Sequence, residues 1–211
     1  MRKNIKQYGN LILSLVLLTA VTLLSLTEGF ITADTVREEC LRLHILAASD
    51  SKEDQDVKLL VRDAVLKAGA DIFSGSVSSD EAMEKISENK AFLEETANRV
   101  LRENGFSYKA HLTMEKEYFE TRQYEDVRLP AGEYNACKIT LGDGDGQNWW
   151  CVMFPPLCLP AVTKNNEEEV YAVFGENGGN LVTEKNGYKI KFRIVEIINE
   201  FIEDLREKNK D

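Results

Sequence analysis

A glycine-rich loop that runs directly into an apolar, proline-terminated segment constrains the fold of this chain more than any other feature. Residues 141–156 read LGDGDGQNWWCVMFPP. The six residues 149–154 are apolar without alternation, which predicts a strand that is central in its sheet or covered on both faces. The double proline that follows ends this strand, because proline has no backbone N–H to donate to a strand ladder. The segment therefore predicts a buried strand that is entered from a polar loop and ends in a sharp chain reversal.

The N-terminus predicts a membrane-directing segment. Three basic residues precede residues 11–26, which carry no charge. A spanning helix needs about 20 residues, with a range of roughly 17–25, whereas the apolar part of a signal peptide has about 7–15. Because this segment falls between the two, a cleaved signal peptide and an uncleaved anchor over residues 11–27 both remain open. Either one leaves the basic residues inside and exports the chain after about residue 30.

The domain organisation follows from this segment. Ala33 offers a signal-peptidase cleavage position, although Ile31 is an unfavourable residue at the minus-three position of that site. We therefore divide the 211 residues into 1–33, a signal peptide or signal anchor, and 34–211, a single exported domain. A domain of this size can build one sizeable core.

The charge argues against nucleic acid as a partner. The formal net charge is −10, and the first 33 residues are net basic, so the exported part is still more acidic. Such a surface repels a phosphate backbone, and it is typical of a soluble secreted domain.

The chain has four cysteines, which become informative once the chain is exported, because disulfides persist outside the cytoplasm. Cys151 and Cys158 are the nearest pair and predict a disulfide worth roughly 2–3 kcal/mol on a chain-entropy argument. Cys40 and Cys137 either pair with each other or stay free, and the sequence does not choose between the three connectivities. No Cys-x-x-Cys spacing occurs, so we expect no metal site and no cofactor.

The periodicity predicts a strand at residues 41–47 and then two helices. An Asp50/Glu53 capping box opens the first helix, which runs to about residue 72, and a Ser78/Glu81 box opens a second, long helix that ends at Asn104. Alternating residues then predict strands at 108–114, 127–129 and 134–141, before the strand at 149–154.

The last fifty residues give weaker signals. Residues 165–169 and 175–179 are typical of loops, residues 188–192 alternate as in a short strand, and residues 194–205 have the spacing of a closing amphipathic helix. In sum, the sequence predicts an α+β fold in which two N-terminal amphipathic helices and a C-terminal helix pack on a mainly antiparallel sheet.

Catalytic signals are weak. The chain contains no nucleophile elbow, zinc-protease motif or phosphate-binding loop. His44 and Asp50 form the one histidine–carboxylate combination that would serve an envelope hydrolase, and a structural histidine is the better interpretation. Asp143 and Asp145 have oxygen ligands suited to calcium, but a plain loop between two strands is favoured because the later acidic ligand is missing.

The tryptophan pair is the strongest candidate for a binding surface. Trp149 and Trp150 are consecutive strand residues and point to opposite faces, so one of them needs a cover or a partner. Large aromatic residues are favoured anchors of interfaces. We assign Trp149, Trp150, Phe154 and Pro155 to partner binding. A purely structural role for both tryptophans and a cell-wall-binding module are the alternatives.

Several stretches together resemble one protein family. They are LRLHILA at residues 41–47 with SDS at 49–51, VRDAV at 61–65, LPAGEY at 129–134, and the GDGDGQNWWCVMFPPLC segment at 142–158. This combination, behind an export segment, is similar to the stage II sporulation protein R family of endospore-forming bacteria. Ala48 stands where the family has asparagine.

The resemblance implies an exported signal that is not an enzyme. Members of the family are made in the forespore and exported into the space between the forespore and mother-cell membranes. There they activate a membrane-bound aspartic protease, which removes the pro-sequence of sigma E in the mother cell. The resemblance thus implies the protease as partner, the intermembrane space as location, membrane contact through the N-terminal segment, and no small-molecule substrate.

Overall fold

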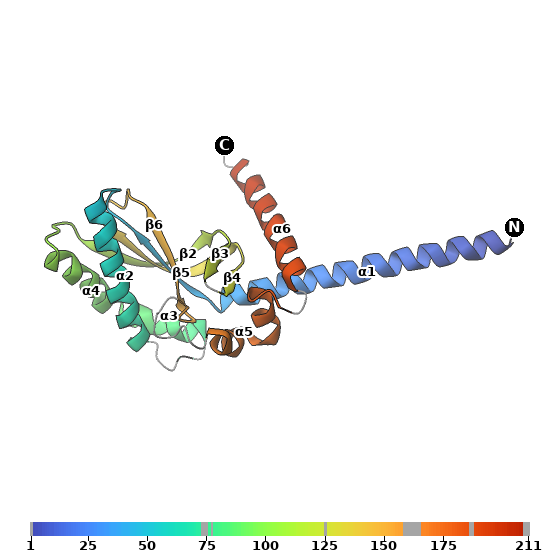
Figure 1. The fold of residues 1–211 in the computed structure, drawn as a ribbon, viewed down its shortest axis with the longest axis horizontal. Helices are drawn as coiled ribbons and strands as arrows, with labels where there is room; N and C mark the ends of the chain where they lie inside the picture. The colour runs from blue at the N-terminus through green and yellow to red at the C-terminus, as the bar shows by residue number, and fades with distance from the viewer. Residues whose placement is uncertain are drawn as a thin grey trace.

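The structure is a computed structural model that describes residues 2–72, 76, 78–124, 126–157, 166–185 and 188–208. Figure 1 shows a long N-terminal helix that projects from a folded body. The elements in chain order are α1 (Arg2–Glu38), β1 (Leu41–Leu46), α2 (Lys52–Ile72), α3 (Ser79–Glu88), α4 (Lys90–Glu103), β2 (Ala110–Phe119), β3 (Arg122–Tyr124), β4 (Val127–Leu129), β5 (Gly132–Leu141), β6 (Asn148–Phe154), α5 (Asn166–Val182) and α6 (Tyr188–Lys208).

The central sheet has four strands in the order β2-β5-β1-β6. The pairs β2–β5 and β1–β6 are antiparallel, while β1 and β5 are parallel. A separate two-stranded hairpin is formed by β3 and β4. The predicted α+β class with a mainly antiparallel sheet is confirmed.

Each face of the sheet carries its own core. Leu41, Leu43 and Ile45 of β1 point to one face, where α2, α3 and α4 contribute Val61, Ile86 and other apolar side chains. The opposite face carries a second cluster, in which the hairpin, α5 and the end of α1 take part. Successive strand residues alternate between faces, so Arg42 and His44 of β1 lie on this second face.

The end of α1 belongs to the folded body. Residues 11–24 of this helix are exposed, whereas Ala33 and Val36 are fully buried. Ala33 packs with Leu181 and Phe192, which belong to α5 and α6. The predicted domain boundary at residue 33 thus falls inside a continuous helix whose last turns pack against the C-terminal segment.

Helix starts and stops explain two differences from the sequence prediction. α2 is capped by Ser51, whose Oγ accepts from the Asp54 backbone N–H at 3.2 Å, and not by Asp50. The long helix predicted after Ser78 is two helices, although Ser78 does cap the first one as expected. Asn89 divides them, because its side-chain amide donates to the Lys85 carbonyl oxygen at 2.8 Å and so ends α3.

The C-terminal prediction was wrong in two places. The strand expected at residues 188–192 is the first turn of α6, in which Tyr188 and Phe192 are buried and Ile190 between them is 71% exposed. Burial at a spacing of four is helical, and the apparent alternation came from apolar residues on two different helix faces. The loops expected at 165–169 and 175–179 lie largely in α5, which is interrupted at Gly175 with a φ of 67°.

Candidate functional site

The two stretches that most characterise the sequence lie side by side in the fold. β1 pairs with β6, so that His44 stands opposite Trp150 and Leu46 opposite Asn148. The loop at 142–147 joins β5 to β6 and crosses the end of β1, because β5 and β6 are not neighbours in the sheet. Two segments about a hundred residues apart therefore form one surface.

The 142–147 loop is held against residues 47–50 by hydrogen bonds from its backbone N–H groups. The Gly146 N–H donates to the Ala47 carbonyl oxygen at 2.9 Å, and the Gln147 N–H donates to Asp50 Oδ1 at 2.8 Å. A Cβ on Gly146 would lie 2.2 Å from the carbonyl oxygen of Ser49. Only glycine allows this approach, which explains one glycine of the motif without a metal.

Lys58 also holds the 142–147 loop in place. Its side chain is 3% exposed, and its Nζ donates to Gln55 Oε1 at 2.6 Å and to the Gln147 carbonyl oxygen at 2.7 Å. Burial lowers the pKa of this lysine, and the nearby negative charge of Asp50 opposes that shift. Asp50 is thus committed to the loop and does not pair with His44.

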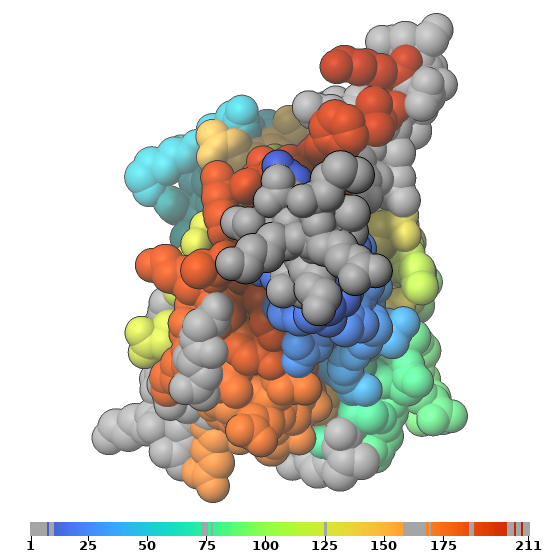
Figure 2. All heavy atoms as spheres, turned by 90° about the vertical axis from the view of Figure 1, so that its right-hand side faces the viewer, coloured from blue at the N-terminus to red at the C-terminus, as the bar shows by residue number. Residues whose placement is uncertain are grey.

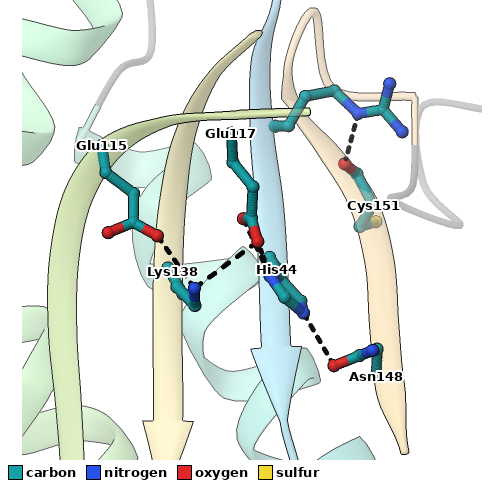
Figure 3. A network of polar contacts seen from close by, with 7 residues as sticks. His44, Glu115, Glu117, Lys138, Asn148 and Cys151 are labelled. Atoms are coloured by element: carbon teal, nitrogen blue, oxygen red, sulfur yellow. Dashed lines mark hydrogen bonds and ion pairs between the residues drawn. The ribbon is translucent and has the colours of Figure 1, made fainter. Parts of the chain in front are cut away.

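A polar cluster centred on His44 lies on the second face of the sheet (Figure 3). The His44 Nδ1 is 2.8 Å and 2.9 Å from the two carboxylate oxygens of Glu117, and its Nε2 is 2.9 Å from Asn148 Oδ1. Lys138 donates to Glu115 at 2.9 Å and to Glu117 at 3.5 Å. The hydrogen bond to Glu115 is the main reason why the pKa of Lys138 is raised. Both nitrogens of the buried imidazole therefore face oxygen acceptors.

The cluster fixes the orientation of Trp150. The His44 ring stacks on the indole with 3.7 Å between centroids and an interplanar angle of 20°. Phe119 meets the same indole edge-on at 4.9 Å, and the Arg122 guanidinium lies 5.4 Å from its centroid. Such contacts hold an aromatic side chain in one position and reduce the entropy that it loses on binding a partner.

Arg42 is a buried cation beside this cluster. Its Nε donates to the Cys151 carbonyl oxygen at 3.2 Å and its Nη2 to the Tyr124 hydroxyl at 2.6 Å. The guanidinium lies 4.3 Å from the Phe119 ring centroid and 4.8 Å from that of Tyr134. No carboxylate of the described residues forms an ion pair with Arg42. Its charge is instead stabilised by aromatic faces.

An open cleft of about 550 Å³ lies at the start of β6. The residues that line it come from β3 with the residue before it and from the start of β6: Thr121, Arg122, Gln123, Tyr124, Asn148, Trp149 and Trp150. Trp149 turns toward the helix-covered face, where the Arg62 guanidinium lies 4.5 Å from its centroid. The cleft therefore combines aromatic and hydrogen-bonding groups, as is typical of a docking surface.

The structure separates the four predicted partner-binding residues into two pairs. Trp149 and Trp150 are partly exposed at the cleft, whereas Phe154 and Pro155 are buried at the other end of β6. Phe154 is 4% exposed and belongs to the core. Only the two tryptophans are positioned to touch a partner directly, and the contact itself stays a prediction.

The cysteines and the acidic loop residues can be placed only in part. Cys151 is buried on β6, while Cys158 lies outside the described residues, so the Cys151–Cys158 disulfide stays a prediction. Cys40 and Cys137 are buried free thiols. Asp143 and Asp145 are exposed, and among the described residues no three acidic, histidine or cysteine side chains are grouped to hold a metal ion.

The sequence alone did not reveal Glu117, Asn148 and Arg42 as parts of this site. Alternation along β2 does place Glu117 on the polar face of its strand. Its contact with His44 depends on the order β2-β5-β1, because the side chain has to reach across β5. The pairing of His44 with Asp50, which the sequence suggested, does not form.

An apolar N-terminal helix attached to an α+β domain defines a class of exported or membrane-tethered proteins. The helical stretch Leu11–Glu38 is long enough to cross a membrane and contains an 18-residue window with a mean hydropathy of 2.1, although a signal sequence passes the same test. This helix indicates export of the domain that follows it.

Sequence comparison identifies the family. The sequence model of stage II sporulation protein R matches residues 37–164. The protein of that name from Bacillus subtilis (strain 168) is 40% identical over 124 residues, which cover 59% of this chain and 55% of the relative. The chain belongs to the stage II sporulation protein R family. The matched region spans about half the length of this relative. No solved structure matches the chain.

Proposed function

We propose that this protein is an exported signal that activates a membrane-bound aspartic protease, which then removes the pro-sequence of sigma E in the mother cell. It acts from the space between the forespore and mother-cell membranes and performs no bond chemistry itself. Its membership of the sporulation protein R family and its apolar N-terminal helix support this role. The carrying observation is the cleft at the start of β6, where Trp150 is half-exposed and held in place by His44.

The geometry of the cleft supports docking more than acid–base chemistry. His44 is 3% exposed, and its two nitrogens are occupied by Glu117 and Asn148. A general base must reach the proton that it removes, and this imidazole has no free nitrogen at the surface. Its contribution is to support Trp150 from behind, as a well-packed neighbour supports an interface anchor.

Activation follows if the cleft binds the active arrangement of the protease more tightly than its inactive one. A ligand shifts such an equilibrium only by its difference in affinity for the two states. A pair of protease ectodomains brought together by the signal would satisfy this requirement. An aromatic anchor typically contributes about 2 kcal/mol or more to binding, which corresponds to roughly a 30-fold change in affinity.

Co-expression in a non-sporulating host tests this function. The full chain, the protease and pro-sigma E would be produced together, and maturation of sigma E followed by immunoblot. Trp150→Ala is expected to reduce maturation strongly, whereas Phe92→Ala is the matched control, because Phe92 is a 55% exposed aromatic on α4 that does not line the cleft. Full maturation with folded Trp149→Ala and Trp150→Ala variants would overturn the assignment of the cleft.

Two further arms separate the alternatives. A chain without residues 1–27 is expected to fail, because the signal has to leave the cytoplasm to meet the protease ectodomain. Purified chain that pelleted with peptidoglycan through Trp150, without any effect on the protease, would favour the cell-wall-binding module. Maturation that persisted with Trp150→Ala but was lost with His44→Ala at unchanged stability would favour the envelope hydrolase.

A further inference from the structure

α6 carries two apolar faces, and the fold uses only one of them. Tyr188, Phe192 and Val195 are buried against α1 and α5. A second apolar stripe is exposed: Ile190 at 71%, Ile197 at 50%, Phe201 at 62% and Leu205 at 45%. The half-buried Ile194 completes spacings of four, three, four and four, so these side chains lie along one face of the helix. This face is opposite to the buried one.

The helix is fastened to α1 at the point where the apolar N-terminal segment meets the domain. Lys191 Nζ donates to Glu28 Oε2 at 2.8 Å. A Cβ on Gly29 would lie 3.6 Å from Lys191 Cβ and 3.8 Å from Val195 Cγ2, so the two helices are in close contact there. The continuous run of exposed apolar residues on α1 ends at Leu24, a few residues before this contact, and Ile31 is exposed just beyond it. If α1 crosses a bilayer, α6 begins at its surface.

The orientation of α6 fits a position in the membrane interface. Figure 1 shows that α6 runs across α1 and not along it. A spanning helix lies roughly along the bilayer normal, so α6 would lie near the plane of the membrane. Figure 2 views the molecule from the N-terminal end of α1, and α5 and α6 form much of the face seen there. This is the face that a membrane around α1 would meet.

The charges near the start of α6 add to this picture. Lys189, Lys191 and Arg193 flank the apolar stripe beside α1, and every acidic residue of α6 follows Arg193. Helices that lie in a membrane interface combine an apolar face with Lys and Arg on its borders. A locally basic region is needed for attraction to anionic lipids, because the chain as a whole has a net charge of −10.

We infer that the exposed stripe of α6 binds the surface of the lipid bilayer that α1 enters, as an interfacial helix beside the N-terminal anchor. The stripe would bury its side chains at the boundary between headgroups and acyl chains, to a depth of about 5–10 Å. It would fix the orientation of the domain over the membrane and thereby the direction in which the cleft of β6 faces. Membrane docking through α6 does not depend on which partner the cleft binds.

Photo-crosslinking of the full chain in lipid vesicles tests this contact. The variant Phe201→p-benzoylphenylalanine would be reconstituted in phosphatidylglycerol/phosphatidylethanolamine vesicles, irradiated and analysed by mass spectrometry. The expected product is a lipid adduct, at a yield roughly tenfold above that of the control Phe92→p-benzoylphenylalanine, which carries the same probe at an exposed position on α4. Both variants reach the vesicles through the same α1, so insertion alone does not explain a difference.

Two outcomes would overturn the inference, and a third would overturn its electrostatic part. Equal and low lipid yields at both positions would overturn it. Adducts between two copies of the chain would overturn it as well and would make α6 a self-association surface. The variant Ile190→p-benzoylphenylalanine, at the basic end of the stripe, repeats the test if the first variant misfolds, and it is expected to label anionic vesicles more strongly than purely phosphatidylcholine vesicles. Equal labelling in both vesicle types would refute the electrostatic contribution.

Discussion

Two neighbouring carboxylates on β2 allow a direct measurement of what the His44 contact contributes. Glu115 and Glu117 lie on the same face of the same strand, and both reach Lys138, at 2.9 Å and 3.5 Å. Only Glu117 also contacts His44, with 2.8 Å to Nδ1. The Glu117 side chain is 19% exposed and that of Glu115 40%. Replacing each by glutamine keeps its shape and removes its charge.

The expected losses of stability differ. A hydrogen bond that involves a charged group contributes about 1.5–3 kcal/mol when it is shielded from water, and the His44–Glu117 contact meets that condition because the His44 side chain is 4% exposed. The Glu115–Lys138 pair is more exposed, and such pairs contribute about 0–1 kcal/mol. We expect Glu117→Gln to lower the free energy of unfolding by about 1–2 kcal/mol more than Glu115→Gln does.

Urea unfolding of the detergent-solubilised full chain would measure this difference, with tryptophan fluorescence as the signal. The fluorescence also reports locally, because Trp150 stacks on His44. Glu117→Gln should therefore change the native-state spectrum, and Glu115→Gln should not. If both variants lost the same stability and kept the same spectrum, the cluster would be an ordinary surface network and the support that it gives to Trp150 would be disproved.

Further predictions concern the loop, the thiols and the N-terminus. Gly146→Ala should cost about 1–3 kcal/mol or more in urea unfolding, because its Cβ meets backbone 2.2 Å away; Gly105→Ala, with open space at a φ of +84°, should cost only about 1–2 kcal/mol. Iodoacetamide should not label Cys40 or Cys137 in the native protein at pH 8, since burial raises the pKa of each thiol to about 12, and labelling without unfolding would contradict this. In the unfolded chain these thiols keep their ordinary pKa of 9.0, so they ionise there first as the pH rises. Their contribution to the free energy of unfolding is therefore complete below about pH 9 and should be lost toward pH 12. A variant with alanine at both positions should lose less stability over the same range. The intact mass of the exported chain should show that no cleavage occurs after Ala33, because this residue is fully buried.

The sequence was sufficient where periodicity decides the structure. The alternation in β2 and β5 follows from residue spacing alone, and the structure confirms it. The spacing also predicts most of the buried face of α2, where Val57, Val61 and Val65 are buried, but Leu60 on the expected stripe is 48% exposed. It was insufficient where strand order decides. Residues 149–154 predicted a strand that is central or covered, because they are apolar on both faces. The structure shows that β6 is covered but not central: it lies at the end of the four-stranded sheet, and helices and the hairpin cover its faces.

The site depends on the same distinction. The tryptophan pair was visible as an aromatic dipeptide, but the support of Trp150 by His44 requires β1 and β6 to be neighbours. His44 was noticed with the wrong acid, because sequence proximity favoured Asp50, whereas Glu117 is brought to His44 from 73 residues away. Strand order is a long-range property that no local spacing encodes.

The last turns of α1 link the membrane-directing segment to the functional surface. Val36 of α1 lies in the same cluster as Tyr134, Phe119 and Val152, and Phe119 in turn packs on Trp150. Arg37 reaches the turn before β5, where its Nε donates to the Ala131 carbonyl oxygen at 3.0 Å. A rigid helix that is packed into the core in this way restricts the orientation of the cleft relative to the membrane more tightly than a flexible linker would. An uncleaved anchor would therefore do more than retain the protein, because it would also direct the tryptophan cleft, and this is a physical reason to expect that the helix stays attached to the domain.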